Sequence, residues 1–257
     1  MGGQLVEKGL LEKYRRAINT GSMVTAENAK NALGVNVDGY VMPMFLSQTA
    51  IAFNSDMIKT PPKSYDELVQ WSQQNPKAFG YNGIKNGMSG VSFVVGWMYA
   101  YGTDAQRLSA LPYDKGVEKS GARSWTKLKE FNKNVTFTPG NAGTLDMLSR
   151  GEITMGPVWV DMFYSWKRSG QASAVHQAGV DLPPACGRQP MYYVVPAHAA
   201  QPKLAQEFIA LATSPDVQAQ GIVKQFNWYP GIDAQYVKGK LDEATGRNCL
   251  LKFRQKI

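Results

Sequence analysis

The sequence predicts an α/β fold, and two observations lead to this prediction. Helix and strand patterns alternate along the chain with mostly short connections, which is typical of α/β layers. In addition, a helix, a strand and a second helix follow one another without interruption over residues 138–170. In such layers a ligand often meets the turn from a strand into a helix, where N–H groups of the helix lack partners. The stretch 138–170 is therefore the first place to expect a functional site.

The first half of this stretch contains a helix signal and a strand signal. Asn141 is suited to cap the helix at its start, and Gly151 follows the helix where a left-handed conformation is common. A short strand is expected over residues 152–155, and the pair Gly156 and Pro157 is expected to end it. The strand would then lead directly into the second helix.

The second helix begins near two candidate ligand contacts. Its apolar stripe, at spacings of three, four and seven, comprises Trp159, Met162, Phe163 and Trp166. Trp159 and Asp161 lie where the strand turns into this helix, so both are candidate functional residues. The alternative is that Trp159 belongs to the core and that the Asp161 carboxylate offsets the helix dipole.

Further helices and strands are predicted on both sides of this stretch. Helices are expected over 4–17, 64–75, 90–101, 123–132, 201–213 and 214–225, and strands over 40–45, 49–53, 79–81, 174–180 and 191–195. The strongest local signal is the capping box that Ser64 forms with Glu67. Helix 90–101 is almost entirely apolar and is expected to be buried. Residues 228–231 are expected to form a turn with exposed aromatic side chains.

The composition is that of an ordinary globular protein. Of the 257 residues, 44% are hydrophobic and 19% are charged, so the chain can bury a substantial core. No apolar run approaches the roughly 18 residues that would span a membrane, and the charged amino end is not a secretory signal as it stands. The protein is therefore either cytosolic or a chain from which a signal has been removed.

The basic residues and the cysteines carry little functional information. The net charge is +8, and part of the excess lies between residues 236 and 257. A nucleic-acid-binding surface would need stacking aromatics or a known module beside this charge. A solvated basic helix explains it better, so no nucleic-acid partner is expected. Cys186 and Cys249 lack a metal-binding spacing and form either one disulfide bond or two separate thiols.

The sequence offers few groups for catalysis. It has only two histidines, His176 and His198, and none of the common hydrolase, nucleotide-binding or zinc-protease motifs. Asp146 and Glu152 could form the carboxylate pair of a glycoside hydrolase. A solvated helix face or a helix cap explains both carboxylates better. A hydrolase is therefore the weaker alternative, and no enzyme is expected.

Three stretches together carry a resemblance to a known family. Residues 50–76 combine a strand, an Asn-x-Asp turn, a double proline and a capped helix, residues 145–161 contain LDMLSRGEITMGPVWVD, and residues 204–220 contain LAQEFIALATSPDVQAQ. In this order and spacing they resemble the extracellular solute-binding proteins of ABC importers, the group that includes maltose, polyamine, thiamine and ferric-iron binders. Within that group the chain looks most similar to binders of the thiamine- or polyamine-transporter type.

The resemblance implies a periplasmic-binding-protein type II fold with two α/β lobes joined by hinge strands. Residues 1–47 plus 188–225 would form lobe one, residues 48–187 lobe two, and residues 226–257 a carboxyl-terminal helical segment. Family members begin with a strand, a helix and a second strand before the segment that residues 2–17 resemble. We therefore expect an incomplete first lobe and an amino-terminally truncated chain. The expected location is periplasmic or extracellular, without a signal sequence in this chain.

The resemblance also implies a function and a set of ligand contacts. A monomer would bind a small solute in the cleft between the lobes, close over it, and deliver it to an ABC permease. The candidate ligand contacts are Gln48, Ser89, Ser92, Trp159, Asp161, Tyr192, Tyr193, Trp228 and Tyr229. Aromatic rings beside a carboxylate favour a cationic or heteroaromatic solute. For Ser89 and Ser92, capping of the helix is the alternative role.

Other functions stay open at this point. Tyr192 and Tyr193 resemble the tyrosine pair of ferric-iron binders, but adjacent residues in a strand point to opposite faces, so no metal or other cofactor is expected. Because the first lobe is expected to be incomplete, the chain could instead be a non-binding remnant or an interaction protein.

Overall fold

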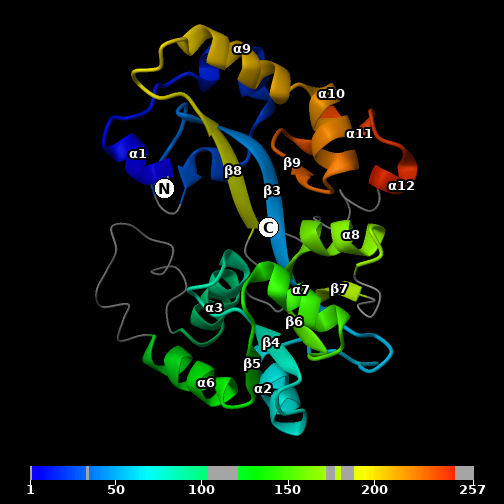
Figure 1. The fold of residues 1–257 in the computed structure, drawn as a ribbon. Helices are drawn as coiled ribbons and strands as arrows, with labels where there is room; N and C mark the ends of the chain where they lie inside the picture. Colours follow the sequence, from blue (N-terminus) through cyan, green and yellow to red (C-terminus); the bar gives the residue numbers. More distant parts are fainter. Residues whose placement is uncertain (1, 33–34, 103–120, 172–176, 181–187, 247–257) are drawn as a thin grey trace. The chain divides into compact units, whose positions relative to one another are not determined.

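The computed structural model describes residues 2–32, 35–102, 121–171, 177–180 and 188–246 (Figure 1). The chain splits into two compact units: unit 1 is Met1–Ser47 with Gln189–Ile257, and unit 2 is Gln48–Arg188. It passes from unit 1 into unit 2 within strand β3 (Val41–Phe53) and returns within strand β8 (Arg188–Val194). Helices and strands alternate in the described chain, so the predicted α/β class is confirmed.

Unit 2 is built on a mixed sheet. Its strands lie in the order β5 (Val135–Phe137), β4 (Phe79–Tyr81), β6 (Met155–Trp159), β3 and β7 (Gln177–Val180). Strand β4 runs parallel to β5 and to β6, whereas β3 runs antiparallel to β6 and to β7. The register of β3 and β6 places Thr49 opposite Trp159 and Phe53 opposite Met155.

Three helices of unit 2 begin at the same edge of this sheet. The helices of unit 2 are α2 (Tyr65–Gln74), α3 (Met88–Tyr101), α6 (Ala122–Asn132), α7 (Asn141–Ser149) and α8 (Val160–Arg168). Helices α3, α7 and α8 follow the parallel strands β4, β5 and β6 in turn. Their amino ends therefore lie at the carboxyl edge of these strands, which is where α/β proteins bind ligands.

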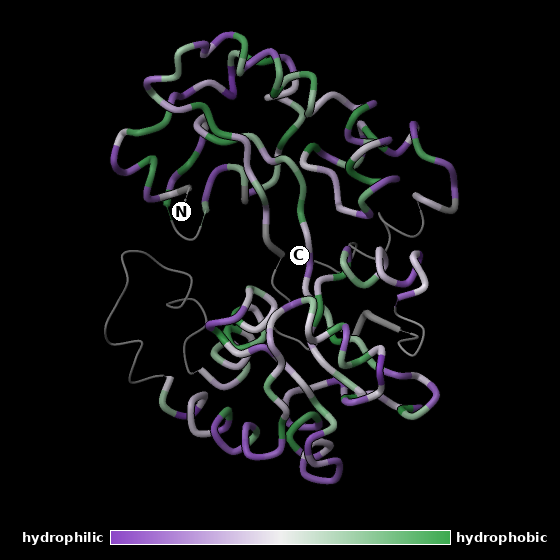
Figure 2. The backbone as a smooth tube through the Cα atoms, viewed as in Figure 1, coloured by the Kyte–Doolittle hydropathy of each residue, from purple (hydrophilic) through white to green (hydrophobic). Residues whose placement is uncertain are grey.

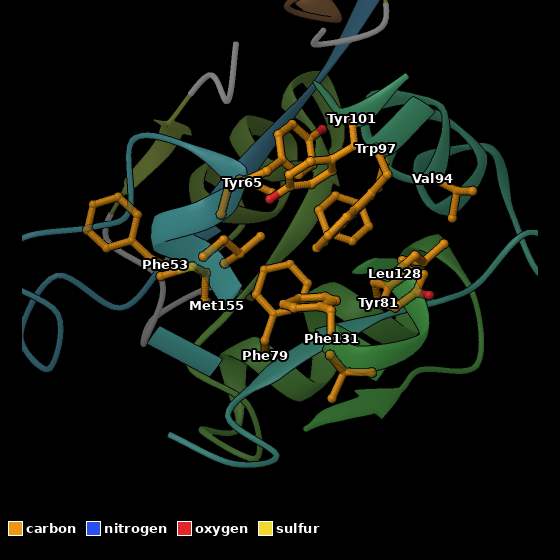
Figure 3. Close-up of a cluster of buried hydrophobic side chains, with 14 of the residues drawn as sticks. Phe53, Tyr65, Phe79, Tyr81, Val94, Trp97, Tyr101, Leu128, Phe131 and Met155 are labelled. Atoms are coloured by element: carbon orange, nitrogen blue, oxygen red, sulfur yellow. The ribbon is translucent and has the colours of Figure 1, made fainter. Parts of the chain in front are cut away.

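An aromatic cluster forms the core of unit 2 (Figure 3). The Trp97 side chain is fully buried, with its ring 4.9 Å from Phe131 and 5.1 Å from Tyr65 between centroids. Phe93 lies 5.3 Å from Phe79 and 5.0 Å from Tyr81. Stacked, tilted and edge-on rings at these distances attract one another beyond their burial. Helix α3 is therefore buried, as its apolar sequence predicts.

The predicted capping box begins helix α2. The Ser64 hydroxyl oxygen accepts a hydrogen bond from the Glu67 N–H at 3.1 Å, and the Glu67 carboxylate accepts one from the Lys63 N–H at 2.9 Å. The second bond reaches one residue further back than in the ideal motif. Figure 2 shows many hydrophilic positions along α2 and α6, which is the pattern of helices with one face in solvent.

Unit 1 contains many short elements. They are α1 (Gly2–Glu7), the 3₁₀ turns η1 (Arg15–Ala17), η2 (Asn19–Met23) and η3 (Glu27–Ala29), β1 (Asn31–Ala32), β2 (Val35–Asn36), the unit 1 part of β3, β8, α9 (Pro202–Ala212), α10 (Pro215–Val217), the π-helix η4 (Gln218–Gln225), β9 (Tyr229–Pro230), α11 (Ala234–Lys238) and α12 (Glu243–Gly246). Strands β1 and β2 pair with each other, and β8 and β9 pair with β3. The core combines Tyr14, Met42, Ile209 and Val223 with other side chains, including Ile232 and Val237.

The helix predicted over 4–17 is wrong beyond its first turns. Helix α1 ends at Glu7, and Gly9 takes a positive φ of 65° just after it. Leu11 then forms a bridge with Pro196. Arg15 is buried, and its guanidinium donates to the carbonyls of Ala29 and Val41. Long-range pairing therefore overrides the local helix pattern.

Two predictions about strand limits are also wrong. The two strands predicted over 40–45 and 49–53 are one strand, β3, which begins at Val41 and continues through Pro43. Strand β6 begins at Met155 and continues through Gly156 and Pro157. A Cβ on Gly156 would lie 2.3 Å from the Gly80 carbonyl oxygen, so this glycine permits close approach of β4 rather than ending the strand.

Two further strands differ from the sequence prediction. Strand β5 has no counterpart among the predicted elements, because its three residues are too few to show alternation. The predicted turn 228–231 contains strand β9, which pairs with β3 at Phe45 and Leu46. Residues 174–176 of a predicted strand, His176, and both cysteines lie outside the described residues.

Candidate ligand-binding surfaces

Unit 2 brings Thr49, Ser92 and Trp159 together at the carboxyl edge of β6. Thr49 lies opposite Trp159 in the β3–β6 pair, and its hydroxyl is 2.6 Å from the Ser92 hydroxyl. Ser92 lies in the second turn of α3 and is half-buried. Strand β3 and helices α3 and α8 therefore contribute to one site, which we call the unit 2 edge (Thr49, Ser92, Trp159, Asp161). Thr49 is buried, and the other three residues are half-buried.

The backbone at Trp159 places two side chains at the start of α8. Trp159 is the last residue of β6 and the N-cap of α8, with extended φ and ψ of −75° and 127°. The Trp159 side chain makes no capping hydrogen bond. Trp159 and Asp161 are both half-buried, so each retains exposed surface. The helix dipole stabilises a carboxylate in the first turn, where Asp161 lies.

Ser89 has a different role from Ser92, because it belongs to a buried amide network. Its hydroxyl donates to the side-chain oxygens of Asn141 at 2.7 Å and Asn82 at 3.1 Å, and Asn82 also donates to Asn141 at 3.0 Å. The Ser89 N–H donates to the same Asn141 oxygen at 3.3 Å. Ser89 is fully buried. This network joins the amino ends of α3 and α7 beneath the unit 2 edge.

The role predicted for Asn141 is wrong in one respect. Gly140 is the N-cap of α7 and makes no side-chain bond, whereas Asn141 accepts the N–H of Ser89 at the start of α3. Asn141 therefore caps a neighbouring helix rather than its own. Sequence analysis missed Thr49, Asn82 and Asn141 as partners of the two serines. The Asn82–Gly83 pair, a common turn signal, was the only indication available.

Gln48 lies on β3 and is the first residue of unit 2. Gln48 and the preceding Ser47 are both buried, with 7% of each residue exposed. The backbone of β3 therefore positions the buried Gln48 side chain at the boundary between units 1 and 2. Its role as a ligand contact stays a prediction.

The two tyrosines of β8 lie on opposite faces of the strand and have different surroundings. The Tyr193 ring packs edge-on against Phe208 at 6.2 Å, and the Tyr193 carbonyl accepts a hydrogen bond from the Tyr14 hydroxyl at 2.8 Å. Tyr192, on the other face of the strand, is half-buried. Burial raises the pKa of Tyr192 to about 12, although the nearby Arg15 charge opposes this rise. Both phenols therefore remain protonated at neutral pH.

Trp228 is enclosed by two other rings of unit 1. Its ring stacks on Phe45 at 3.8 Å and on Phe226 at 4.7 Å between centroids. Both faces of the indole are therefore covered by protein. Tyr229 pairs with Leu46 across β9 and β3, and its side chain packs against the unit 1 core. Contact of Trp228 or Tyr229 with a ligand stays a prediction.

A pocket of unit 2 lies at the opposite end of the parallel strands. Its volume is about 280 Å³, and it is lined by Met57, Ile58, Lys59, Thr60, Trp71, Asn75, Ala78 and Thr154. Ala78 immediately precedes β4 and Thr154 immediately precedes β6. The pocket is therefore at the amino ends of these strands, whereas the unit 2 edge is at their carboxyl ends.

Asp146 and Glu152, the carboxylate pair considered for glycoside cleavage, both form ion pairs at the protein surface. Arg150 forms ion pairs with Asp146 at 2.7 Å and with Glu152 at 3.2 Å, and all three side chains are about half exposed. These contacts are those expected at the solvated end of a helix. Within the described residues, no group of three or more His, Cys, Asp and Glu side chains is placed to hold a metal ion.

The alternating helices and strands and the mixed sheet define the fold as α/β. The chain belongs to the bacterial extracellular solute-binding proteins, because the profile of that family matches residues 1–234. The family predicted from the three sequence stretches is thereby confirmed. No curated protein sequence matches the chain.

Solved structures of ABC-transporter binding proteins share this fold. An ABC transporter protein from Clostridium perfringens has a TM-score of 0.68 at 20% identity, over 96% of this chain and 70% of that one. A spermidine/putrescine transporter substrate-binding protein from Streptococcus pneumoniae has a TM-score of 0.67 at 14% identity, over 97% and 71%. A periplasmic thiamin binding protein has a TM-score of 0.57 at 21% identity, over 89% and 62%. The expected periplasmic-binding-protein type II fold is confirmed.

Two further observations bear on the whole protein. The chain spans 70%, 71% and 62% of the length of these three relatives. In the part of the chain that the structure describes, no helix is both long enough and apolar enough to cross a membrane.

Proposed function

We propose that this chain binds a small solute outside the cytoplasm and delivers it to the permease of an ABC importer. Membership of the extracellular solute-binding family supports the role, and the relatives named above are transporter components. The observation that carries the proposal is the unit 2 edge, where Thr49, Ser92 and Trp159 meet at the carboxyl end of β6. Ligand sites of α/β folds occur at this edge.

We further propose that units 1 and 2 act as the two lobes. The unit boundaries at Gln48 and Arg188 lie beside the lobe boundaries predicted at Gln48 and Gly187. The described part of the predicted carboxyl-terminal segment contributes Ile232 and Val237 to the core of unit 1. Each unit would supply its own ligand contacts, from the unit 2 edge and from the aromatic residues of β8 and β9.

The half-exposed indole of Trp159 beside the Asp161 carboxylate favours a cationic or heteroaromatic solute. Thiamin, named for one relative, has both properties, and spermidine and putrescine, named for another, are linear cations. The subgroup, the monomeric state and the periplasmic location remain part of this proposal.

A test measures affinity by isothermal titration calorimetry with thiamin, spermidine and putrescine. We expect one of them to bind, and Trp159→Ala to weaken that binding about tenfold or more, which corresponds to about 1.4 kcal/mol. Trp125→Ala is the matched control, because Trp125 is an exposed tryptophan of the same unit on α6. An affinity within about twofold of the unsubstituted protein for Trp159→Ala would remove Trp159 from the site.

A second candidate function is an interaction protein that binds no solute. Leu204, Phe208 and Leu211 lie at spacings of four and three on α9 and are 61%, 60% and 64% exposed. Such a stripe on one helix face is a feature of protein–protein contacts. This candidate is favoured if no solute binds and if Phe208→Ser and Leu211→Ser abolish an association that the unsubstituted chain shows.

A further inference from the structure

Unit 1 contains a stack of three aromatic rings in nearly parallel planes. Trp228 lies between Phe45 and Phe226, with interplanar angles of 5° and 15°. Several ring pairs in the core of unit 2 are edge-on instead. In unit 1, the backbone segments that carry the three rings hold their planes nearly parallel, as the next two features show.

Two backbone features hold Phe226 and Trp228 on the same side. The π-helix η4 ends at Gln225, and Asn227 follows in the left-handed conformation with a φ of 56°. The Asn227 N–H bonds the Val223 carbonyl at 3.1 Å, which is the pattern of a helix closed by a left-handed residue. The Trp228 N–H bonds the Ile222 carbonyl at 3.1 Å. Phe226 and Trp228 therefore both belong to a hydrogen-bonded turn, which sets the relative position of their rings.

Gln218 fixes the third ring relative to the other two. Its amide nitrogen donates to the carbonyls of Met44 and Ala212, each at 3.1 Å, and its amide oxygen accepts the Gly231 N–H at 2.7 Å. Gln218 is fully buried. Met44 and Gly231 adjoin Phe45 of β3 and the paired strand β9. This one side chain therefore ties the strand that carries Phe45 to the segment that follows Trp228.

The Phe226 end of the stack is open to solvent. Phe226 is 47% exposed although one of its faces is covered by the Trp228 ring. A ring with one face covered and about half of its surface exposed has its other face available. An additional planar ring could continue the stack at this position, in the geometry that the three protein rings already have.

We propose that this stack is a ligand platform on unit 1, and that Phe226 takes a planar heteroaromatic ring of the solute. The proposal rests on the proposed function and deepens it, because it selects between the solute types named for the relatives. A heteroaromatic ring can cover the whole Phe226 face, as bases stack on aromatic side chains in other proteins. A linear polyamine has no plane to stack and would contact only part of the Phe226 face, through cation–π attraction of one ammonium group. The expected solute class is therefore heteroaromatic.

Titration calorimetry with thiamin as the planar probe and spermidine as the linear probe tests this proposal. We expect thiamin to bind more tightly than spermidine. Phe226→Leu, which keeps an apolar side chain but removes the plane, should weaken thiamin binding about fivefold, which corresponds to about 1 kcal/mol. Phe226→Tyr should retain most of the affinity. Phe208→Leu is the matched control, because Phe208 is an exposed phenylalanine of the same unit on α9.

The outcomes separate this proposal from the proposed function. Unchanged thiamin affinity in Phe226→Leu would overturn the platform. If spermidine binds and thiamin does not, the platform is overturned while the solute-binding function stands. If neither probe binds, the platform is overturned, and the proposed function is overturned as well when putrescine also fails to bind. A loss of the same size in Phe208→Leu would also overturn the platform, because the effect would then not depend on the stack.

Discussion

Each of the two units of this chain is stabilised by a different kind of interaction. Unit 2 packs aromatic rings from α2, α3 and α6 against its sheet, with Trp97 and Phe131 fully buried. Unit 1 has a mostly aliphatic core and relies on buried polar side chains, Arg15 and Gln218, that bond several backbone segments at once. Helix α3 is apolar and buried, whereas α9 buries Ile209 and exposes a second apolar stripe. Apolar sequence alone therefore does not tell which helix face is covered.

The largest expected effect concerns the aromatic core of unit 2. Trp97→Ala should lower the free energy of unfolding by about 4 kcal/mol, because it removes the ring that contacts Phe131 and Tyr65 and leaves a cavity. Urea denaturation followed by circular dichroism measures this change. Trp125→Ala, which removes an exposed ring of α6, should change stability by less than about 1 kcal/mol. Equal losses in the two variants would contradict the importance of the cluster.

The corresponding change in unit 1 removes a hydrogen-bonding side chain. Gln218→Leu should cost about 2 to 3 kcal/mol, because the Gly231 N–H and two carbonyls lose their buried partner. The same denaturation experiment applies, and Gln220→Leu is the control, since Gln220 is exposed and makes one bond to the Lys240 carbonyl. A decrease in the free energy of unfolding below about 0.5 kcal/mol for Gln218→Leu would show that the hydrogen bonds of the Gln218 side chain do not stabilise unit 1.

Alkaline pH should also weaken both units through buried tyrosines. Burial raises the pKa of Tyr192 to about 12 from its ordinary value of 10.0, and it raises the pKa of Tyr14 and Tyr101 as well. A group with a raised pKa stabilises the fold fully below pH 10 and loses this contribution as the pH rises to about 12, because the unfolded chain ionises first. Denaturant midpoints measured across this range should fall. A smaller fall in Tyr192→Phe than in the unsubstituted protein is expected.

The smallest effect is expected on the exposed stripe of α9. Leu204→Gln should change the free energy of unfolding by less than about 0.5 kcal/mol, because both residues favour helices and the leucine is 61% exposed. Thermal unfolding compared with Ile209→Gln, on the buried face of the same helix, provides the contrast. Similar large losses in both variants would mean that the stripe is covered in the folded protein.

The sequence predicted elements with strong local signals and failed where distant residues decide. The Ser64 cap, strand 79–81 and helix 123–132 were predicted closely, because capping residues and helical periodicity act locally. The pair Gly156 and Pro157 was expected to end a strand, but both residues lie within β6, where Pro157 is opposite Ile51 of β3. Local pattern therefore sufficed for helices more often than for strand limits.

The candidate site was only partly accessible from sequence. Trp159 was predicted at a strand-to-helix turn, and it lies there as the N-cap of α8. Its neighbour Thr49 lies 110 residues earlier in the sequence, and only the β3–β6 register brings the two together. Phe45 was also missed, since its stacking with Trp228 depends on the pairing of β3 with β9. Phe226 was missed because its stacking with Trp228 depends on the left-handed Asn227 between them. Side-chain neighbours that depend on strand register cannot be read from periodicity.

Amide hydrogen exchange with and without bound solute tests the central claim most directly. It compares the unit 2 edge with the 280 Å³ pocket at the other end of the same strands. With thiamin or spermidine at saturation, we predict slower exchange around Ser92 and over 159–162, and unchanged exchange over 57–60. Slower exchange over 57–60, with no change at 159–162, would contradict the assignment of the solute site to the carboxyl edge of β6.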